Sequence, residues 1–207
     1  MNIVIGIAGG TGAGKTALVG ELARRLGGCV VEVDAYYHDR TGMPPEDRRR
    51  LNYDEPAAID QALLVDHLAR LARGEAVAKP VYSFESHTRV GERRLAPASL
   101  VIVEGLFTWW WAEVRHRLVC KIFIDAPVAV RLSRRLQRDI AQRGRTPEQV
   151  MHQYLTTVLP MHDRYVEPCR LSADLLVDNE GPLDETVKAC VDGMAVHLRR
   201  RPSCTLT

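Results

Sequence analysis

The chain has 207 residues, which is enough for one domain with a core that folds on its own. Its 28 Lys and Arg residues against 26 Asp and Glu residues give a net charge of +2, so no global field would draw it to nucleic acid or to a membrane surface. Five scattered cysteines without a C-x-x-C pair, and no apolar run of membrane-spanning length, predict a soluble cytoplasmic protein with reduced thiols.

The first strong signal is a glycine-rich segment between a predicted strand at residues 3–8 and a predicted helix at residues 17–23. In this context the G-x-x-x-x-G-K-[ST] pattern predicts a phosphate cradle, because glycines let backbone N–H groups point inward and the helix N-terminus adds positive charge. A glycine-rich turn with an incidental lysine is the weaker interpretation, since only four lysines occur and one falls at the required place. The predicted triphosphate-binding residues are Gly9, Gly10, Thr11, Gly12, Ala13, Gly14, Lys15 and Thr16.

Strands and helices are then predicted to alternate. Residues 29–33 form a buried strand ending at Asp34, and a polar loop follows whose Arg48–Arg50 run is interpreted as a solvated face without a role. The next elements are a turn at 52–56, a helix at about 59–73, a hairpin of strands 79–84 and 88–95, and a strand at 100–103 closed by Glu104 and Gly105.

In the second half, Trp109–Trp111 are expected to pack a helix start against the sheet or a neighbouring subunit. A strand at 119–124 ends at Asp125, which resembles the N-cap of the following helix. The remaining elements are a helix at 128–142 broken by Gly144, a helix from Pro147 to about Tyr165 bent by Pro160, a strand at 175–177 and a helix at 183–200.

This alternation predicts an α/β fold: a parallel sheet of the P-loop NTPase type with helices on both faces. We expect one P-loop domain over residues 1–207, with a small β-hairpin at about 79–95 and an arginine-rich helical lid at about 131–146.

Asp34 and Glu104 each end a predicted strand, and ligands of such sheets sit at the carboxyl ends of the strands. Phosphoryl transfer needs one carboxylate to orient or deprotonate the attacking hydroxyl and another to hold Mg²⁺. The alternative is a purely structural role, in which each acid caps the next helix. We interpret Asp34 and Glu104 as functional, and Asp125 as a cap.

Six arginines cluster near the lid. Four of them lie on one helical face, and Arg143 and Arg145 follow the helix. A solvated basic face is the usual explanation, and nucleic-acid binding is hard to reconcile with a net charge near zero. Beside a phosphate cradle, the better interpretation is a lid that stabilises transferred charge. The four on the helix are Arg131, Arg134, Arg135 and Arg138.

Several segments together resemble the uridine kinase (uridine–cytidine kinase) family. The P-loop alone is widespread, whereas the Y-x-F-x-x-H-x-R segment and the R-G-R lid are far more specific. Tyr53, Glu55 and the tryptophan triplet depart from the pattern. The resemblance continues through Gln153 to Asp174 and rests on residues 9–16, 34–37, 52–56, 82–89, 103–105, 134–139 and 143–145.

The resemblance implies transfer of phosphate from ATP or GTP, with Mg²⁺, to the 5′-hydroxyl of uridine and cytidine in a homo-oligomer, generally a tetramer. It implies Asp34 as the catalytic aspartate, Lys15 on the phosphates, and Thr16 and Glu104 as Mg²⁺ ligands. Arg138 and Arg143 match lid residues on the phosphates. The substrate-binding set it implies is Tyr37, the ribose contacts Asp54 and Arg145, the nucleoside contact Arg135, and the pyrimidine pocket of Tyr82, Phe84, His87 and Gln153.

Three other functions fit the sequence less well. A regulatory GTPase needs an N-K-x-D guanine reader, and none of the four lysines follows an asparagine. A binding module that has lost catalysis is disfavoured by the intact Lys15, Asp34 and Glu104. A P-loop kinase acting on a sugar phosphate or pantothenate is closer, but the aromatic residues and His87 of segment 82–89 suit a flat base better.

Overall fold

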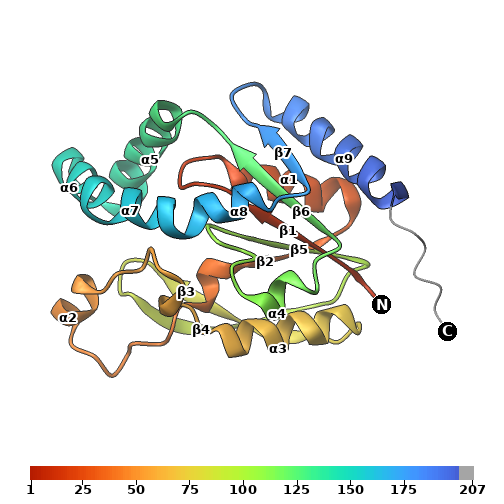
Figure 1. Ribbon diagram of the computed structural model, residues 1–207. Coiled ribbons are helices and arrows are strands. Elements are labelled where there is room, and N and C mark those ends of the chain that lie inside the picture. Colours follow the sequence, from red (N-terminus) through yellow and green to blue (C-terminus); the bar gives the residue numbers. More distant parts are fainter. Residues whose placement is uncertain (201–207) are drawn as a thin grey trace.

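The computed structural model describes residues 1–200; residues 201–207, which include Cys204, lie outside the described residues. Five parallel strands form one sheet in the order β2-β5-β1-β6-β7 (Figure 1). The sheet confirms the predicted strands. Their bounds are β1 Ile3–Ala8, β2 Cys29–Glu32, β5 Leu100–Gly105, β6 Cys120–Asp125 and β7 Leu175–Asp178.

Alternate side chains of each strand point to opposite faces of the sheet, and both faces are buried. In β1, Val4 and Ala8 belong to one hydrophobic cluster, and Ile5 and Ile7 to another. The first cluster includes α3 (Gln61–Ala72) and α4 (Ala112–Arg115), and the second includes α1 (Lys15–Leu26) and α9 (Leu183–Arg200). The predicted arrangement of helices on both faces is therefore confirmed.

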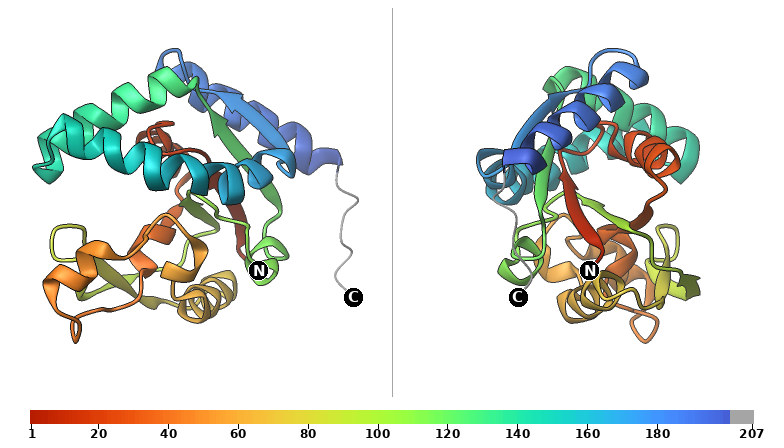
Figure 2. Two further views of the ribbon diagram at one scale, coloured as in Figure 1. Left: turned by 60° about the vertical axis from the view of Figure 1, so that its left-hand side comes forward. Right: turned by 90° about the vertical axis from the view of Figure 1, so that its right-hand side faces the viewer.

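A separate two-stranded antiparallel sheet is formed by β3 (Val77–Ser83) and β4 (Thr88–Leu95), with an irregularity in register between Val81 and Tyr82. This confirms the predicted hairpin. Figure 2 shows the hairpin and the helices α5 to α8 on opposite sides of the carboxyl edge of the sheet.

The helix α5 (Val128–Arg143) ends where expected, at Gly144, whose φ of 61° lies in the left-handed region that glycine adopts readily. Thr146 then begins α6 (Pro147–Gln153) with a capping box. The predicted end of this helical segment at Tyr165 is wrong, since helical structure continues to Leu171. Its further parts are π-helical turns at Tyr154–Val158 and His162–Val166, α7 at Leu159–Met161, and α8 at Glu167–Leu171.

Two other predictions are corrected. The polar loop after β2 contains a short helix, α2 (Pro45–Arg50), whose first turn carries acids and whose last turn carries arginines, as the helix dipole favours. Asp125 is not an N-cap, because Pro127 occupies that position of α5. Its carboxylate instead accepts hydrogen bonds from the N–H of Ala126 and from Nε of Arg170, which connects β6 to α8.

The tryptophan triplet packs as predicted at the start of a helix. Trp109 is buried in the core, and its indole N–H donates to Oγ of Ser172. Trp111 is the N-cap of α4, and Trp110, 39% exposed, meets Tyr165 edge-on. Within residues 1–200, no helix combines the length and apolar character that crossing a membrane requires.

Candidate active site

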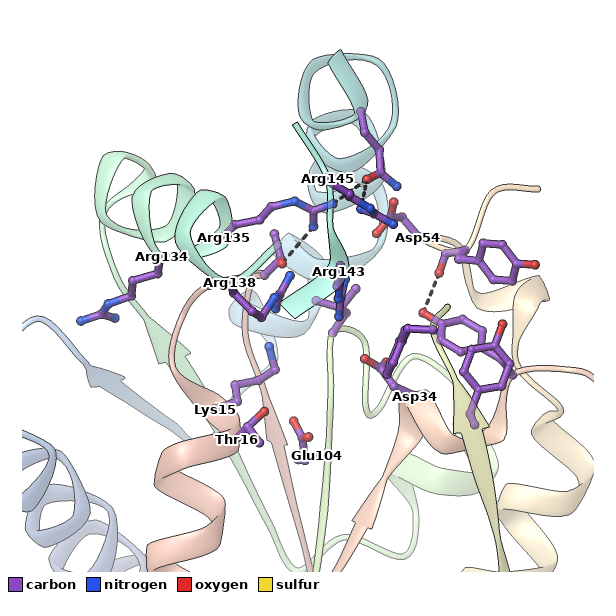
Figure 3. A pocket seen from close by; sticks show the side chains of 18 of the residues that line it. Lys15, Thr16, Asp34, Asp54, Glu104, Arg134, Arg135, Arg138, Arg143 and Arg145 are labelled. Carbon is purple, nitrogen blue, oxygen red and sulfur yellow. Dashed lines mark hydrogen bonds between the residues drawn. The ribbon is translucent and has the colours of Figure 1, made fainter. Parts of the chain in front are cut away.

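A pocket of about 320 Å³ opens at the carboxyl ends of β1 and β5, between the hairpin and the helix α5. Figure 3 shows Arg138 and Arg143 on the side of the lid that faces Lys15, Thr16 and Glu104, with Arg135 and Arg145 farther from them and Arg134 pointing away. All predicted site residues line this pocket except Gly9, Gly10 and Ala13, which belong to the loop beneath it. Tertiary structure thus brings together residues from position 11 to position 153.

The loop between β1 and α1 requires glycine for local reasons. Gly12 and Gly14 have φ values of 75° and 88°, in the left-handed region. A Cβ atom on Gly12 would overlap the carbonyl oxygen of Arg131, and one on Gly14 would overlap the side chain of Asn179. The backbone can therefore approach α5 and the loop after β7 closely.

Lys15 folds back over this loop. Its Nζ atom donates hydrogen bonds to the carbonyl oxygens of Gly9 and Gly10 at 2.8 and 3.1 Å. Burial lowers the pKa of Lys15, while the carboxylates of Glu104 and Asp34 act in the opposite direction. A polyphosphate bound in the loop would give this buried ammonium group a negative partner.

Two carboxylates face the same pocket. Asp34 lies in the 3₁₀ turn Val33–Tyr36 directly after β2, and Glu104 lies near the end of β5, where Ile7 is its neighbour in β1. Burial raises the pKa of Asp34 and raises that of Glu104 to about 7, and Lys15 opposes both shifts. Glu104 and the hydroxyl of Thr16 are oxygen donors, which are the ligands that Mg²⁺ prefers. These residues therefore fit a magnesium ion.

Aromatic rings form the wall of the pocket opposite the phosphate loop. The ring centroids of Tyr37 and Tyr82 are 5.0 Å apart, and His87 stacks on Tyr53 at 4.6 Å with 14° between the planes. Burial raises the pKa of the Tyr82 hydroxyl, and the neighbouring Tyr53 adds to that shift, so the two phenol groups lie close together in this wall. Phe84 completes this wall beside Tyr37 and Tyr82.

The surroundings of His87 favour its neutral form. Burial lowers its pKa, and the positive charges of Arg145 and Arg48 lower it further. A neutral imidazole has one donor and one acceptor nitrogen, so the ring can pair with either kind of group on a flat base.

The predicted lid face divides in the structure. Arg131 points behind the phosphate loop, where its Nε donates to the carbonyl oxygen of Ala126 and its guanidinium lies beside Gly10. Arg135 instead donates to the hydroxyl of Thr11 and to Oε1 of Gln153, both at 3.0 Å. It therefore connects the lid to the phosphate loop.

Gln153 and Asp54 lie at the lid end of the pocket. The amide oxygen of Gln153 accepts hydrogen bonds from Arg135 and from Arg145, the latter at 2.6 Å. Burial raises the pKa of Asp54, and the guanidinium of Arg135 opposes that shift. Figure 3 shows Asp54 and Arg145 near one another at the mouth of the pocket. The predicted pairing of these two residues on one ligand is geometrically reasonable.

Several residues of the site were missed from the sequence. Tyr53, which departs from the family pattern, and Arg49, for which the sequence predicts only a solvated position, both line the pocket. Arg134, predicted as part of the lid face, also lines the pocket, and its Nη1 atom is buried without a hydrogen-bond partner within the described chain. The lining residues outside the predicted site are Ala17, Arg49, Leu51, Tyr53, Leu106 and Arg134.

The pocket has the parts that phosphoryl transfer requires: a glycine-rich phosphate loop, a lysine, two carboxylates and several arginines. The aromatic wall adds a surface for a flat acceptor. The arrangement is that of a kinase for a small molecule.

Comparison with known proteins agrees with this chemistry. Residues 4–184 match the model of the "Phosphoribulokinase / Uridine kinase family". Uridine kinase of Clostridium botulinum (strain Kyoto / Type A2) is 42% identical over 183 residues, covering 86% of this chain and 89% of that protein. Uridine kinase of Clostridium tetani (strain Massachusetts / E88) is also 42% identical, over 86% of this chain and 88% of that protein.

Solved structures share the fold at lower identity. A putative fructose transport system kinase from Silicibacter sp. TM1040 superposes with a TM-score of 0.71 at 22% identity, covering 84% of this chain and 89% of that one. Phosphoribulokinase from Rhodobacter spheroides gives a TM-score of 0.63 at 18% identity, covering 90% and 73%. These likenesses support a P-loop kinase fold.

Proposed function

The chain belongs to the phosphoribulokinase / uridine kinase family, and from this premise we propose that it phosphorylates the 5′-hydroxyl of uridine and cytidine, giving UMP and CMP. The observation that carries the proposal is the placement of Asp34 in one pocket with both Lys15 and the aromatic wall of the hairpin. A nucleoside with its base on the aromatic wall would have its 5′-hydroxyl directed toward the phosphate loop.

The donor is ATP or GTP, with its β- and γ-phosphates in the loop and Lys15 on their oxygens. Thr16 and Glu104 would hold Mg²⁺, which supplies positive charge to those phosphates when bound. Arg138 and Arg143, which line the pocket from the lid, neutralise the charge that spreads over the transferred phosphoryl group.

Asp34 acts on the acceptor. As the 5′-oxygen attacks the γ-phosphorus, the bond from that phosphorus to the β–γ bridging oxygen breaks and the nucleoside diphosphate leaves. The carboxylate of Asp34 accepts the proton of the 5′-hydroxyl. The raised pKa of Asp34 makes its carboxylate a better proton acceptor than an exposed aspartate.

The nucleoside is recognised through both its base and its ribose. Tyr37, Tyr82, Phe84 and neutral His87 contact the base, and Asp54 with Arg145 contacts the ribose diol. Arg135 and Gln153 lie beside them and complete the sugar and base contacts. Carboxylates only accept and guanidinium groups only donate, so together they suit hydroxyls, which do both.

At the level of the whole protein, we propose one kinase domain over residues 1–207, with a nucleoside-binding hairpin at about 79–95 and a lid at about 131–146 that closes over bound substrates. We also propose a cytoplasmic homo-oligomer, a tetramer by family resemblance, without nucleic-acid or membrane partners. The net charge of +2 supports the proposal that the protein has no nucleic-acid or membrane partner. The free thiols of Cys29, Cys169 and Cys190 support the cytoplasmic location.

The proposal is tested by ADP release with MgATP across uridine, cytidine, other nucleosides, sugar phosphates and pantothenate. We expect activity with uridine and cytidine and its loss in Lys15→Ala, which removes the cation on the β- and γ-phosphates. Comparable or greater activity with a sugar phosphate or pantothenate would instead support a kinase of the same fold with another acceptor.

A further inference from the structure

The arginines of the lid converge on Asp139, a residue of α5 whose side chain is fully buried at 0% exposure. Its Oδ1 accepts a hydrogen bond from Nε of Arg138 at 2.9 Å and lies 3.4 Å from Nη1 of Arg143. Its Oδ2 accepts from Nη1 of Arg145 at 3.2 Å and lies 3.7 Å from Nε of Arg135. Four guanidinium groups therefore share one carboxylate.

The backbone of Asp139 holds the same segment. Its carbonyl oxygen accepts hydrogen bonds from the N–H groups of Gly144 and Arg145. These bonds close the end of α5 around the left-handed residue Gly144. The carboxylate of the same residue contacts Arg143 and Arg145, which lie on either side of that glycine.

The charges do not cancel. Four guanidinium groups and one carboxylate leave the cluster with a net charge of +3, which suits a polyphosphate. Burial alone would raise the pKa of Asp139, yet the guanidinium groups of Arg138, Arg143 and Arg135 hold it below its usual range. Burial lowers the pKa of both Arg135 and Arg143. Without Asp139, like charges in a partly buried cluster would repel one another.

Asp139 does not line the pocket, whereas all four of its arginine partners do. We propose that Asp139 is a positioning residue for phosphoryl transfer: it holds Arg138 and Arg143 toward the transferred group, and Arg145 toward the acceptor, before substrates bind. This inference rests on the proposed function, and it assigns to Asp139 a role exerted through the arginines.

The first test is Asp139→Asn, which keeps the shape of the side chain and removes its charge. Displacing a positioned group by about 1 Å can reduce the rate about 10²-fold. We therefore expect kcat with MgATP and uridine to fall about 10²-fold, with a smaller change in the KM for uridine, because the arginines of the lid act mainly on charge that develops during transfer.

Asp174→Asn is the matched control. Asp174 also forms an ion pair, with its carboxylate 3.7 Å from Nζ of Lys121, and it accepts a hydrogen bond from the backbone N–H of Lys121. It does not line the pocket. We expect this variant to keep kcat within about twofold of the unaltered protein, since no pocket-lining residue depends on it.

A second variant separates positioning from a merely structural role. In Asp139→Gly, the space left by the carboxylate is open to formate, which can take its place among the guanidinium groups. We expect formate to raise kcat at least tenfold, whereas chloride at equal ionic strength does not. If Asp139 only supports the fold, Asp139→Gly should have a lower thermal midpoint and a weaker far-ultraviolet circular dichroism signal than the unaltered protein, and formate should not restore kcat.

The two proposals fail in different ways. If the unaltered protein phosphorylates uridine and Asp139→Asn keeps its kcat, the inference about Asp139 is overturned and the proposed function stands. If the unaltered protein phosphorylates no pyrimidine nucleoside, the proposed function is overturned. Asp139→Asn is then compared with the unaltered protein in ADP release with the acceptor that does react, or with MgATP alone, where a fall is still expected.

Discussion

The guanidinium group of Arg143 lies over the ring of Phe84, with 4.6 Å between its Cζ atom and the ring centroid. Arg143 ends the lid helix α5, and Phe84 follows strand β3 of the hairpin. The contact therefore bridges the two sides of the pocket. It places a residue proposed to act on phosphate against one proposed to contact the base, so occupation of either half of the pocket can affect the other.

Replacing the ring tests that bridge. Phe84→Leu removes the aromatic face, and an exposed cation–π contact contributes about 0.5–1 kcal/mol. Phe84 is 39% exposed, so we expect kcat/KM for uridine to fall about two- to fivefold, and Phe84→Tyr to stay close to the unaltered protein. In a double-mutant cycle with Arg143→Ala, the two losses should not be additive; additive losses would show that the contact has no energetic effect on catalysis.

Asp34→Asn tests the proposed base. The amide keeps the size of the side chain but cannot accept the proton of the hydroxyl. We expect kcat to fall about 10²–10⁴-fold, the usual contribution of a positioned base, and the Kd for uridine to change far less. Asp184→Asn, which removes an exposed carboxylate beside Arg25, serves as control. A large change in Kd with unchanged kcat would make Asp34 a binding residue.

The ribose contacts predict discrimination by the 2′-hydroxyl. Removing that hydroxyl leaves partly buried Asp54 or Arg145 short of a partner, which costs more than the bond contributed. We expect kcat/KM for 2′-deoxyuridine to be at least about 10²-fold below that for uridine, the low end for a site that reads a hydroxyl. Asp54→Ala should narrow the gap, mainly through lost activity with uridine. Equal rates for the two nucleosides would leave Asp54 as a turn residue only.

His162 predicts a dependence of stability on pH. Burial and the adjacent Arg131 lower its pKa to about 4, although Asp163 and Asp125 act in the opposite direction. Since the pKa in the unfolded chain is about 6.5, protonation favours unfolding. The contribution of His162 is therefore complete above about pH 6.5 and is lost as the pH falls toward 4.

The measurement is the free energy of unfolding at pH 7.5 and pH 5, from urea titrations. We expect the decrease between these values to be smaller in His162→Gln than in the unaltered protein. His152→Gln removes an exposed histidine and should leave the decrease unchanged. The prediction is wrong if His162→Gln and His152→Gln behave alike.

Local patterns were sufficient for the parts of this protein whose causes are local. The phosphate loop could be predicted because its left-handed backbone positions favour glycine, and because a lysine lies at a set spacing between a strand and a helix. The strands were recognisable because both faces of the sheet are buried, so their sequences are continuously apolar. Asp34 and Glu104 could be placed at one edge because parallel strands share their carboxyl ends.

Tertiary structure alone decided which arginines of the lid line the pocket. Arg131 and Arg135 lie on the same helical face, yet Arg131 packs behind the phosphate loop and Arg135 enters the pocket. The convergence on Asp139 was only partly hidden: Arg135 and Arg143 lie one helical turn before and after it, so the spacing along α5 places them beside it. Arg145 lies beyond the helix, and only the turn at Gly144 brings it back to Asp139. Such contacts depend on how separate elements pack, which the spacing of residues along one element does not specify.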